Sequence, residues 1–229
     1  MLDAILLDND VVLKMCAYAA ADRLLQVATY AAKPPAILQV ASFALQSQVR
    51  RSRSIADHEA AAAQLTIMLD GVQRLEPTEQ EISLAADLEE RAQHEALELD
   101  PGESQLVAIL LYRCAPLLVT GDKRALAALA SVAPAEADGR MACLEQAVAA
   151  IIADDGYLVM FRNGVCSCRP IDKAIANCFS CSSETVSSGD VMGGLRSYIG
   201  ALRTQAGRLL IGSDDLLAIP AQEDRVGFV

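Results

Sequence analysis

Three acidic residues stand where side chains can do chemistry. Asp8 follows the apolar run at residues 4–7, and Asp122 follows the apolar run at residues 117–120 in LLVTGDKRAL. Glu103 lies in the first turn of the strongly apolar helix that leads into the second run. Both runs read as buried strands. Loops at the carboxyl ends of parallel strands converge on one crevice, so the three carboxylates meet if the two strands are neighbours.

Clustered carboxylates repel each other unless a cation neutralises them. Mg²⁺ and Mn²⁺ bind through one or two carboxylates, water and phosphate oxygens, and they can activate water for phosphodiester hydrolysis. The sequence therefore predicts a Mg²⁺ or Mn²⁺ site with Asp8, Glu103 and Asp122 as catalytic acids. Asp10 is a fourth candidate metal ligand because it lies two residues after Asp8.

Each acid also has a purely structural interpretation. Asp100 and Glu103 fit the N-cap and N3 positions of a capping box. Asp122 fits the N-cap of the helix that begins KRALAALA. Asp8 fits an Asp/Asn turn in DND. Helix caps are common, and only the combination of the three acids favours a metal site.

The elements that must position these residues follow an α/β pattern. Strands are expected at residues 4–7 and 117–120 and, as a short element, at 72–77. The other apolar segments VVLKMCAYAAADRLLQ, AILQVASFALQSQV, MACLEQAVAAIIADDG and DVMGGLRSYIGALRTQAGRLL are expected to be helical. PTEQEISLAADLEERAQHEA is also expected to be a helix, with Thr78 and Glu81 at the spacing of a capping box. YLVMFRNGVCSC is ambiguous: its apolar residues fit one face of a helix, which we favour, while Asn163-Gly164 is a hairpin signal. These strands are too apolar to have a solvent-exposed face, which indicates a central, mostly parallel sheet flanked by helices.

Charge limits the classes of partner. The chain has 30 acidic and 19 basic residues, a formal net charge of −11, which opposes generic nucleic-acid binding. Contact with a nucleic acid needs a local basic patch. Two groups could supply one: Arg50, Arg51 and Arg53 in QVRRSRS, and Lys123 with Arg124 beside Asp122. Both also fit ordinary solvated residues.

Other classes of protein find less support. No apolar stretch approaches the roughly 20 residues that span a bilayer, and the start MLDAILLDND lacks a basic segment, so a cytoplasmic protein without a membrane partner is expected. With two histidines, both in alanine- and glutamate-rich surroundings, histidine-based hydrolase chemistry is disfavoured.

The cysteines permit a second metal site. Cys166, Cys168, Cys178 and Cys181 form two close pairs that could hold a structural Zn²⁺, and buried thiols are the alternative. Seven cysteines without a secretory signal argue against a disulfide framework.

Three segments together carry a family resemblance. LLDNDVVL, LDPGESQLVAILL and LLVTGDKRAL, in this order, resemble the signature segments of PIN-domain proteins. The resemblance covers about the first 135 residues. It implies a PIN-like three-layer domain over residues 1–138, followed by a mainly helical extension at 139–229.

The resemblance also implies an activity. PIN-like proteins are metal-dependent nucleases that mostly cleave RNA, often dimeric and often the toxin of a toxin–antitoxin pair with an antitoxin partner. Asp8, Glu103 and Asp122 match the family's acidic metal-site positions, and Asp10 stands where asparagine is common. The family's further acid on the second helix is missing here, and Gln39 is the candidate for its place. A PIN-like binding or regulatory module with impaired catalysis is the alternative function.

Overall fold

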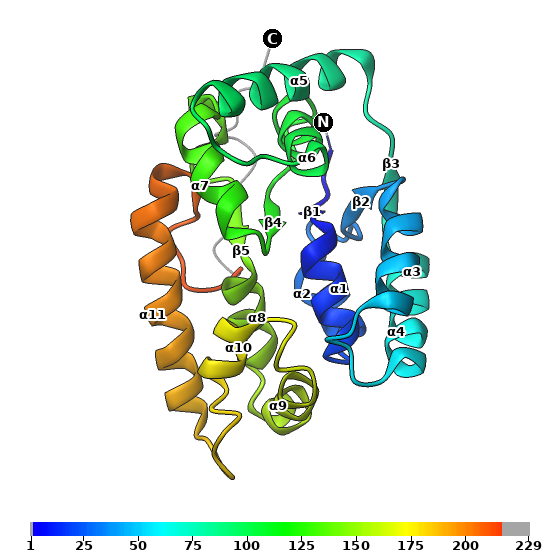
Figure 1. Ribbon diagram of the computed structural model, residues 1–229, viewed down its shortest axis with the longest axis vertical. Helices are drawn as coiled ribbons and strands as arrows, with labels where there is room; N and C mark the ends of the chain where they lie inside the picture. Colours follow the sequence, from blue (N-terminus) through cyan, green and yellow to red (C-terminus); the bar gives the residue numbers. More distant parts are fainter. Residues whose placement is uncertain (1, 217–229) are drawn as a thin grey trace.

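The computed structural model describes residues 2–216 of the chain. Its centre is a sheet of five parallel strands in the order β3-β2-β1-β4-β5 (Figure 1). The strands are β1 (Leu6–Leu7), β2 (Ala36–Leu38), β3 (Gln73–Leu75), β4 (Leu118–Thr120) and β5 (Met141–Cys143). The order places β1 and β4 side by side, with Leu7 opposite Val119.

Helices flank the sheet, which confirms the predicted α/β class. They are α1 (Asn9–Ala17), α2 (Ala21–Val27), α3 (Ala41–Arg51), α4 (His58–Gly71), α5 (Glu79–His94), α6 (Pro101–Tyr112), α7 (Lys123–Val132), α8 (Leu144–Ile152), α9 (Leu158–Ser167), α10 (Lys173–Cys178) and α11 (Ser188–Ala206). Short 3-10 turns lie at Ala135–Ala137, Asp155–Tyr157 and Gly207–Leu209.

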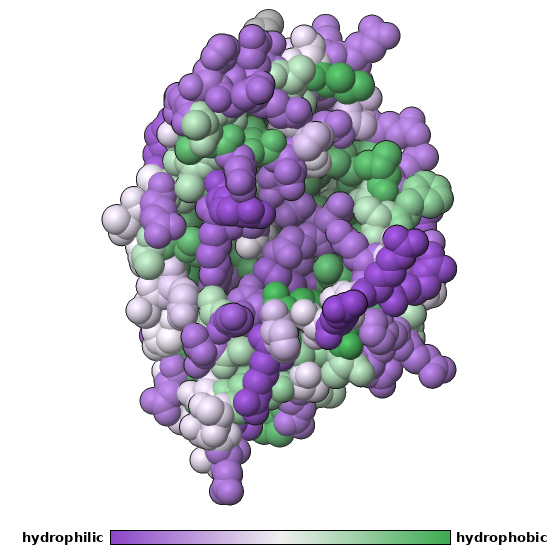
Figure 2. All heavy atoms as spheres, viewed as in Figure 1, coloured by the Kyte–Doolittle hydropathy of each residue, from purple (hydrophilic) through white to green (hydrophobic). Residues whose placement is uncertain are grey.

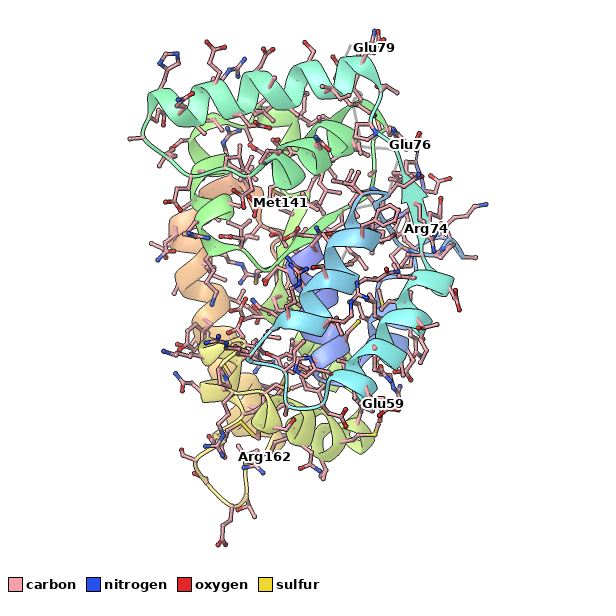
Figure 3. All side chains as sticks on the ribbon, turned by 45° about the vertical axis from the view of Figure 1, so that its right-hand side comes forward. Glu59, Arg74, Glu76, Glu79, Met141 and Arg162 are labelled. Carbon is pink, nitrogen blue, oxygen red and sulfur yellow. A yellow bond between two sulfur atoms is a disulfide. The ribbon has the colours of Figure 1, made fainter. Side chains whose placement is uncertain are left out.

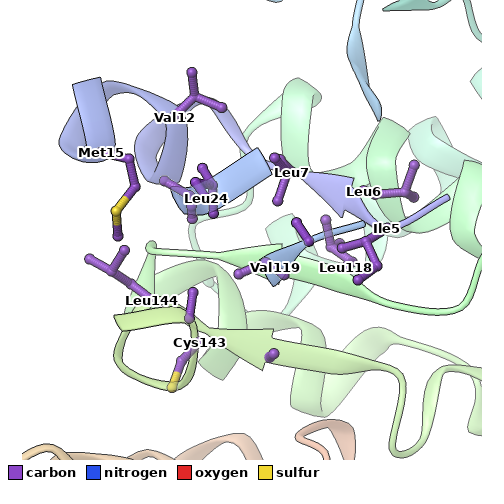
Figure 4. Packing of buried hydrophobic residues seen from close by; sticks show 14 of the residues in the cluster. Ile5, Leu6, Leu7, Val12, Met15, Leu24, Leu118, Val119, Cys143 and Leu144 are labelled. Atoms are coloured by element: carbon purple, nitrogen blue, oxygen red, sulfur yellow. The ribbon is translucent and has the colours of Figure 1, made fainter. Parts of the chain in front are cut away.

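Burial explains the parallel sheet. Every residue of β1, β2, β4 and β5 is buried, so these strands have no face for water. Figure 4 shows Leu6 and Leu7 of β1, Leu118 and Val119 of β4 and Cys143 of β5 in this core.

Two segments predicted to be helical begin as strands. Ala36–Leu38 forms β2 before α3, and Met141–Cys143 forms β5 before α8. A three-residue apolar run has no periodicity of its own, so its neighbours decide its state. Here the backbone of β1 pairs with β2, and β4 pairs with β5.

The helix predicted from residue 11 to 26 is two helices. Ala19 has a positive φ of 57° between α1 and α2, a left-handed conformation that ends the first helix. Other predictions are confirmed: Gln73–Leu75 is a strand, Thr78 and Glu81 form a capping box, and Leu158–Ser167 is a helix.

The sheet continues past the domain boundary expected at residue 138. β5 pairs with β4, and buried residues of α8, α9 and α11 belong to the same hydrophobic cluster as β1. From α8 onward the described chain is helical, while residues 217–229 of the predicted extension lie outside the described residues. None of the helices within residues 2–216 has the length and apolar character needed to cross a membrane.

Candidate functional site

Asp8 follows β1 and caps α1. Its carboxylate accepts hydrogen bonds from the backbone N–H of Asn9 at 2.6 Å and from Oγ1 of Thr120 at 3.0 Å, and the residue is only 7% exposed. Burial, followed by the charge of Asp10, raises the pKa of Asp8 to about 6. Asp8 is thus a buried, uncompensated carboxylate at the carboxyl edge of the sheet.

Asp122 lies after the neighbouring strand and caps α7. Its Oδ1 accepts hydrogen bonds from the backbone N–H groups of Arg124 at 2.7 Å and Ala125 at 3.2 Å. Burial alone would raise the pKa of Asp122, but these hydrogen bonds and the Arg124 guanidinium hold it below its ordinary value. The capping interpretation of Asp122 is therefore correct, and its Oδ2 lies 3.3 Å from Nη2 of Arg124.

Glu103 occupies the N3 position of α6 and is 9% exposed. Its Oε2 accepts a hydrogen bond from the backbone N–H of Asp100 at 3.1 Å, as expected for a capping box. Burial raises the pKa of Glu103 to about 8, with further contributions from the charges of Asp8 and Asp122. Capping thus leaves Glu103 within electrostatic reach of the other two acids.

The three acids therefore occupy one region: β1 and β4 are neighbours, and the charges of Asp8 and Asp122 act on Glu103. Hydrophilic residues lie across the centre of the face shown in Figure 2. A pocket of about 460 Å³ opens beside Glu103 and Asp122. Its polar lining is mostly acidic: Glu89, Glu98, Asp100, Glu103 and Asp122, with Arg124 and Gln93.

Asp10 differs from Asp8 and Glu103 because a lysine ammonium pairs with it. Its Oδ2 lies 2.5 Å from Nζ of Lys14, one turn later on α1. A Cβ on Gly121 would lie 2.1 Å from the same oxygen, so the Asp10 carboxylate rests against the turn between Thr120 and Asp122.

The candidate basic residues differ in their exposure and in their ion pairs. Nζ of Lys123 lies 2.8 Å from Oε1 of the buried Glu145 and so faces inward, whereas Arg124 is exposed and pairs with Glu98 and Asp122. The arginines of QVRRSRS are all exposed: Arg50 and Arg51 end α3, and Arg53 lies just after it.

Two acids near these lysines were missed by the sequence reasoning. Glu145 is the second residue of α8, 0% exposed, and Asp172 caps α10 with Oδ2 2.8 Å from Nζ of Lys14. Glu145 carries the same signal as Asp8, an acid after a buried strand, but the sequence pattern predicts a helix over the residues of β5. Asp172 had no comparable signal.

Gln39 lies at the end of β2 and is exposed, and its backbone N–H donates to the carbonyl of Leu75 at 2.8 Å. It stands at the same edge of the sheet as Asp8. No carboxylate replaces it on α3.

The four cysteines do not form the predicted zinc site. Cys166 and Cys181 are joined by a disulfide, which removes two of the four thiolates, while Cys168 and Cys178 are buried free thiols. The expectation of reduced cysteines is therefore wrong for this one pair. The backbone folds Cys166 to within 5.1 Å of Cys181 between Cα atoms, a proximity that spacing alone did not reveal.

Comparison with protein-family models, with curated proteins and with solved structures found no match to this chain. Across residues 2–216, no three His, Cys, Asp or Glu side chains are arranged as a group that could hold a metal ion. Mg²⁺ needs no such group, because it keeps several waters and uses one or two carboxylates. The hard oxygen donors of Asp8 and Glu103 suit such an ion, whose charge would favour the ionised form of both buried carboxyl groups.

Proposed function

We propose that this chain is a PIN-like, Mg²⁺- or Mn²⁺-dependent endoribonuclease. The observation that carries the proposal is that Asp8, Glu103 and Asp122 come from three separate elements and that the charges of Asp8 and Asp122 act on Glu103 near the carboxyl edge of a parallel sheet. The raised pKa values of Asp8 and Glu103 support it, because both carboxyl groups are buried and neither forms an ion pair with a lysine or arginine among the described residues.

In this proposal Asp8, Glu103 and Asp122 hold the ion, directly or through water. The bound ion would orient and activate water for attack on an RNA phosphodiester. Thr120 fixes the Asp8 carboxylate, and the N–H groups of α7 fix that of Asp122. Asp10 is a weaker candidate ligand than expected because Lys14 already pairs with it.

Binding of RNA is assigned to the exposed arginines. Arg50, Arg51 and Arg53 supply a local positive surface on an acidic protein, and Arg124 adds a cation beside the acids. Lys123 is a weaker candidate since its ammonium pairs with buried Glu145. On the family resemblance alone, the proposal extends to a cytoplasmic homodimer that acts as a toxin with an antitoxin partner.

A second candidate is a PIN-like binding or regulatory module with impaired catalysis. Two observations favour it: a neutral, exposed Gln39 at the end of β2, and the absence of a ready three-ligand group within the described part of the chain. An amide can offer a carbonyl oxygen but adds no charge, so metal affinity is lower than with a carboxylate.

Cleavage of single-stranded RNA by the purified full chain with Mn²⁺ tests the proposal. Asp8→Asn and Asp122→Asn should each abolish cleavage while leaving circular dichroism unchanged, and Asp190→Asn, in the first turn of α11, serves as a control. If both variants still cleave RNA, the proposed nuclease site is refuted. Calorimetric Mn²⁺ binding without any cleavage favours the module.

A further inference from the structure

Lys14 places a buried ammonium at the edge of the acidic site. The residue is 7% exposed, and its Nζ lies 2.5 Å from Oδ2 of Asp10 and 2.8 Å from Oδ2 of Asp172. A Cβ on Gly121 would stand 3.4 Å from the same nitrogen, which puts the ammonium beside the turn that leads to Asp122.

Asp172 divides its two oxygens between two tasks. Oδ1 caps α10 by accepting hydrogen bonds from the backbone N–H groups of Ala174 at 2.9 Å and Ile175 at 3.0 Å. Oδ2 is left to pair with Lys14, and the side chain is only 8% exposed. The neighbouring Lys123 pairs with Glu145 instead, so the ion pair of Asp172 is with Lys14.

The segment that carries Asp172 is anchored at several points. The Cys166–Cys181 disulfide closes it into a loop, and Arg162, labelled in Figure 3, donates to the carbonyls of Phe179, Ser180 and Ser183. The ring of Phe161 packs between those of Tyr18, after α1, and Phe179, after α10, with centroids 5.8 Å and 5.3 Å away.

The charged side chains around the acidic site therefore form two groups. In one group the single ammonium of Lys14 is shared between Asp10 and Asp172. In the other, Asp8 and Glu103 have no ion pair with a lysine or arginine among the described residues, and Asp122 has only the exposed Arg124. Buried ion pairs of this kind are seldom more stable than apolar packing, which points to a role in positioning charge.

We infer that Asp172 is a positioning residue of the acidic site. It holds the Lys14 ammonium against Asp10, so that Asp8, Glu103 and Asp122 alone supply the carboxylates for one divalent ion per chain, directly or through water. The inference rests on the proposed function, since it concerns the ion that function requires. It also gives the C-terminal region a direct part in the site.

Calorimetric titration of the full chain with Mn²⁺ tests this inference. We expect one ion per chain. Asp172→Asn keeps an N-cap acceptor but leaves the Lys14 charge less compensated, so Mn²⁺ affinity should fall about five-fold, the effect of roughly one partly screened charge. Lys14→Met should raise the affinity by a similar factor, because Asp10 then adds its free charge.

Control variants distinguish this positioning role of Asp172 from a purely structural role. Asp57→Asn also replaces an N-cap aspartate, on α4, and should leave affinity unchanged. Lys14→Arg keeps the charge and should retain nearly the native affinity. A structural role for the pair would make Lys14→Met and Asp172→Asn weaken binding alike, and that result overturns the inference, as does a stoichiometry of two.

The titration distinguishes failure of the proposed function from failure of the inference about Asp172. If the native chain binds no Mn²⁺, the proposed function and this inference fall together. If the native chain binds Mn²⁺ and Asp172→Asn matches Asp57→Asn, only the inference fails. That comparison is decisive even if Lys14→Met does not fold.

Discussion

Oγ1 of Thr120 donates a hydrogen bond of 3.0 Å to Oδ2 of Asp8, across 112 residues of sequence. The same hydroxyl oxygen accepts the backbone N–H of Asp122 at 3.1 Å. One side chain at the end of β4 thus links the acid of β1 to the loop that carries the acid of β4.

Replacing this hydroxyl tests its role. Thr120→Val leaves a buried carboxylate oxygen and an N–H without their partner, so the free energy of unfolding should fall by about 1–3 kcal/mol, and Mn²⁺ binding should weaken. Thr120→Ser retains the hydroxyl and should recover most of both. Denaturant unfolding and calorimetry measure the two effects; equal behaviour of Val and Ser would contradict the assignment.

The metal-free protein should lose stability as the pH rises. Asp8 and Glu103 have ordinary pKa values of 3.8 and 4.5, raised to about 6 and about 8 in the fold. Between these values the folded state keeps protons that the unfolded state has lost, so the free energy of unfolding falls with increasing pH. Chemical denaturation in a chelator from about pH 4 to about pH 8 should show this loss, and Mn²⁺ should reduce it at the upper end. Stability that rises over this range without metal would contradict the two shifts.

Asp8→Asn should stabilise the metal-free protein at about pH 8. Asparagine is an equally good N-cap, and it removes an ionised buried group that lies near Asp10. The gain should be on the order of 1–2 kcal/mol and should vanish at about pH 4, where the native carboxyl is protonated. Thermal unfolding at both pH values measures it, and a gain that is independent of pH would point to another cause.

Gly164 marks a close approach between α9 and the end of α1. A Cβ at this position would lie 2.2 Å from the carbonyl oxygen of Tyr18, which is backbone and cannot swing aside. Gly164→Ala should therefore lower the free energy of unfolding by about 1–3 kcal/mol. Gly193→Ala, in α11 with open space around it, is the matched control and should raise the free energy of unfolding by about 0.5–1 kcal/mol. The same sign for both variants in denaturant melts would contradict the close packing.

The disulfide predicts a thiol count and a change in stability. Unfolded, unreduced protein should react as five free thiols of the seven cysteines. Because Cys166 and Cys181 are 15 residues apart, reduction should lower the free energy of unfolding by about 3 kcal/mol. Cys181→Ser should reproduce this loss and be insensitive to a dithiol reductant. Seven reactive thiols in the unreduced chain would contradict the bond.

The elements recognisable from sequence were those with a local cause. The capping box of Thr78 and Glu81 forms within a single helical turn, and the apolar run before Asp122 is long enough to read as buried. Asp8, Glu103 and Asp122 could be singled out for the same reason, since each stands at a strand or helix end visible in the sequence.

Local patterns were enough to predict the α/β class, the helix caps and the places of Asp8, Glu103 and Asp122 at strand and helix ends, because these depend on neighbours within a few residues. The tertiary structure decided that β2 and β5 are strands, that Cys166 meets Cys181, and that Lys14 lies between Asp10 and Asp172. Each of these depends on partners far away in the chain, and no local pattern specifies which distant groups the packing of the core brings together.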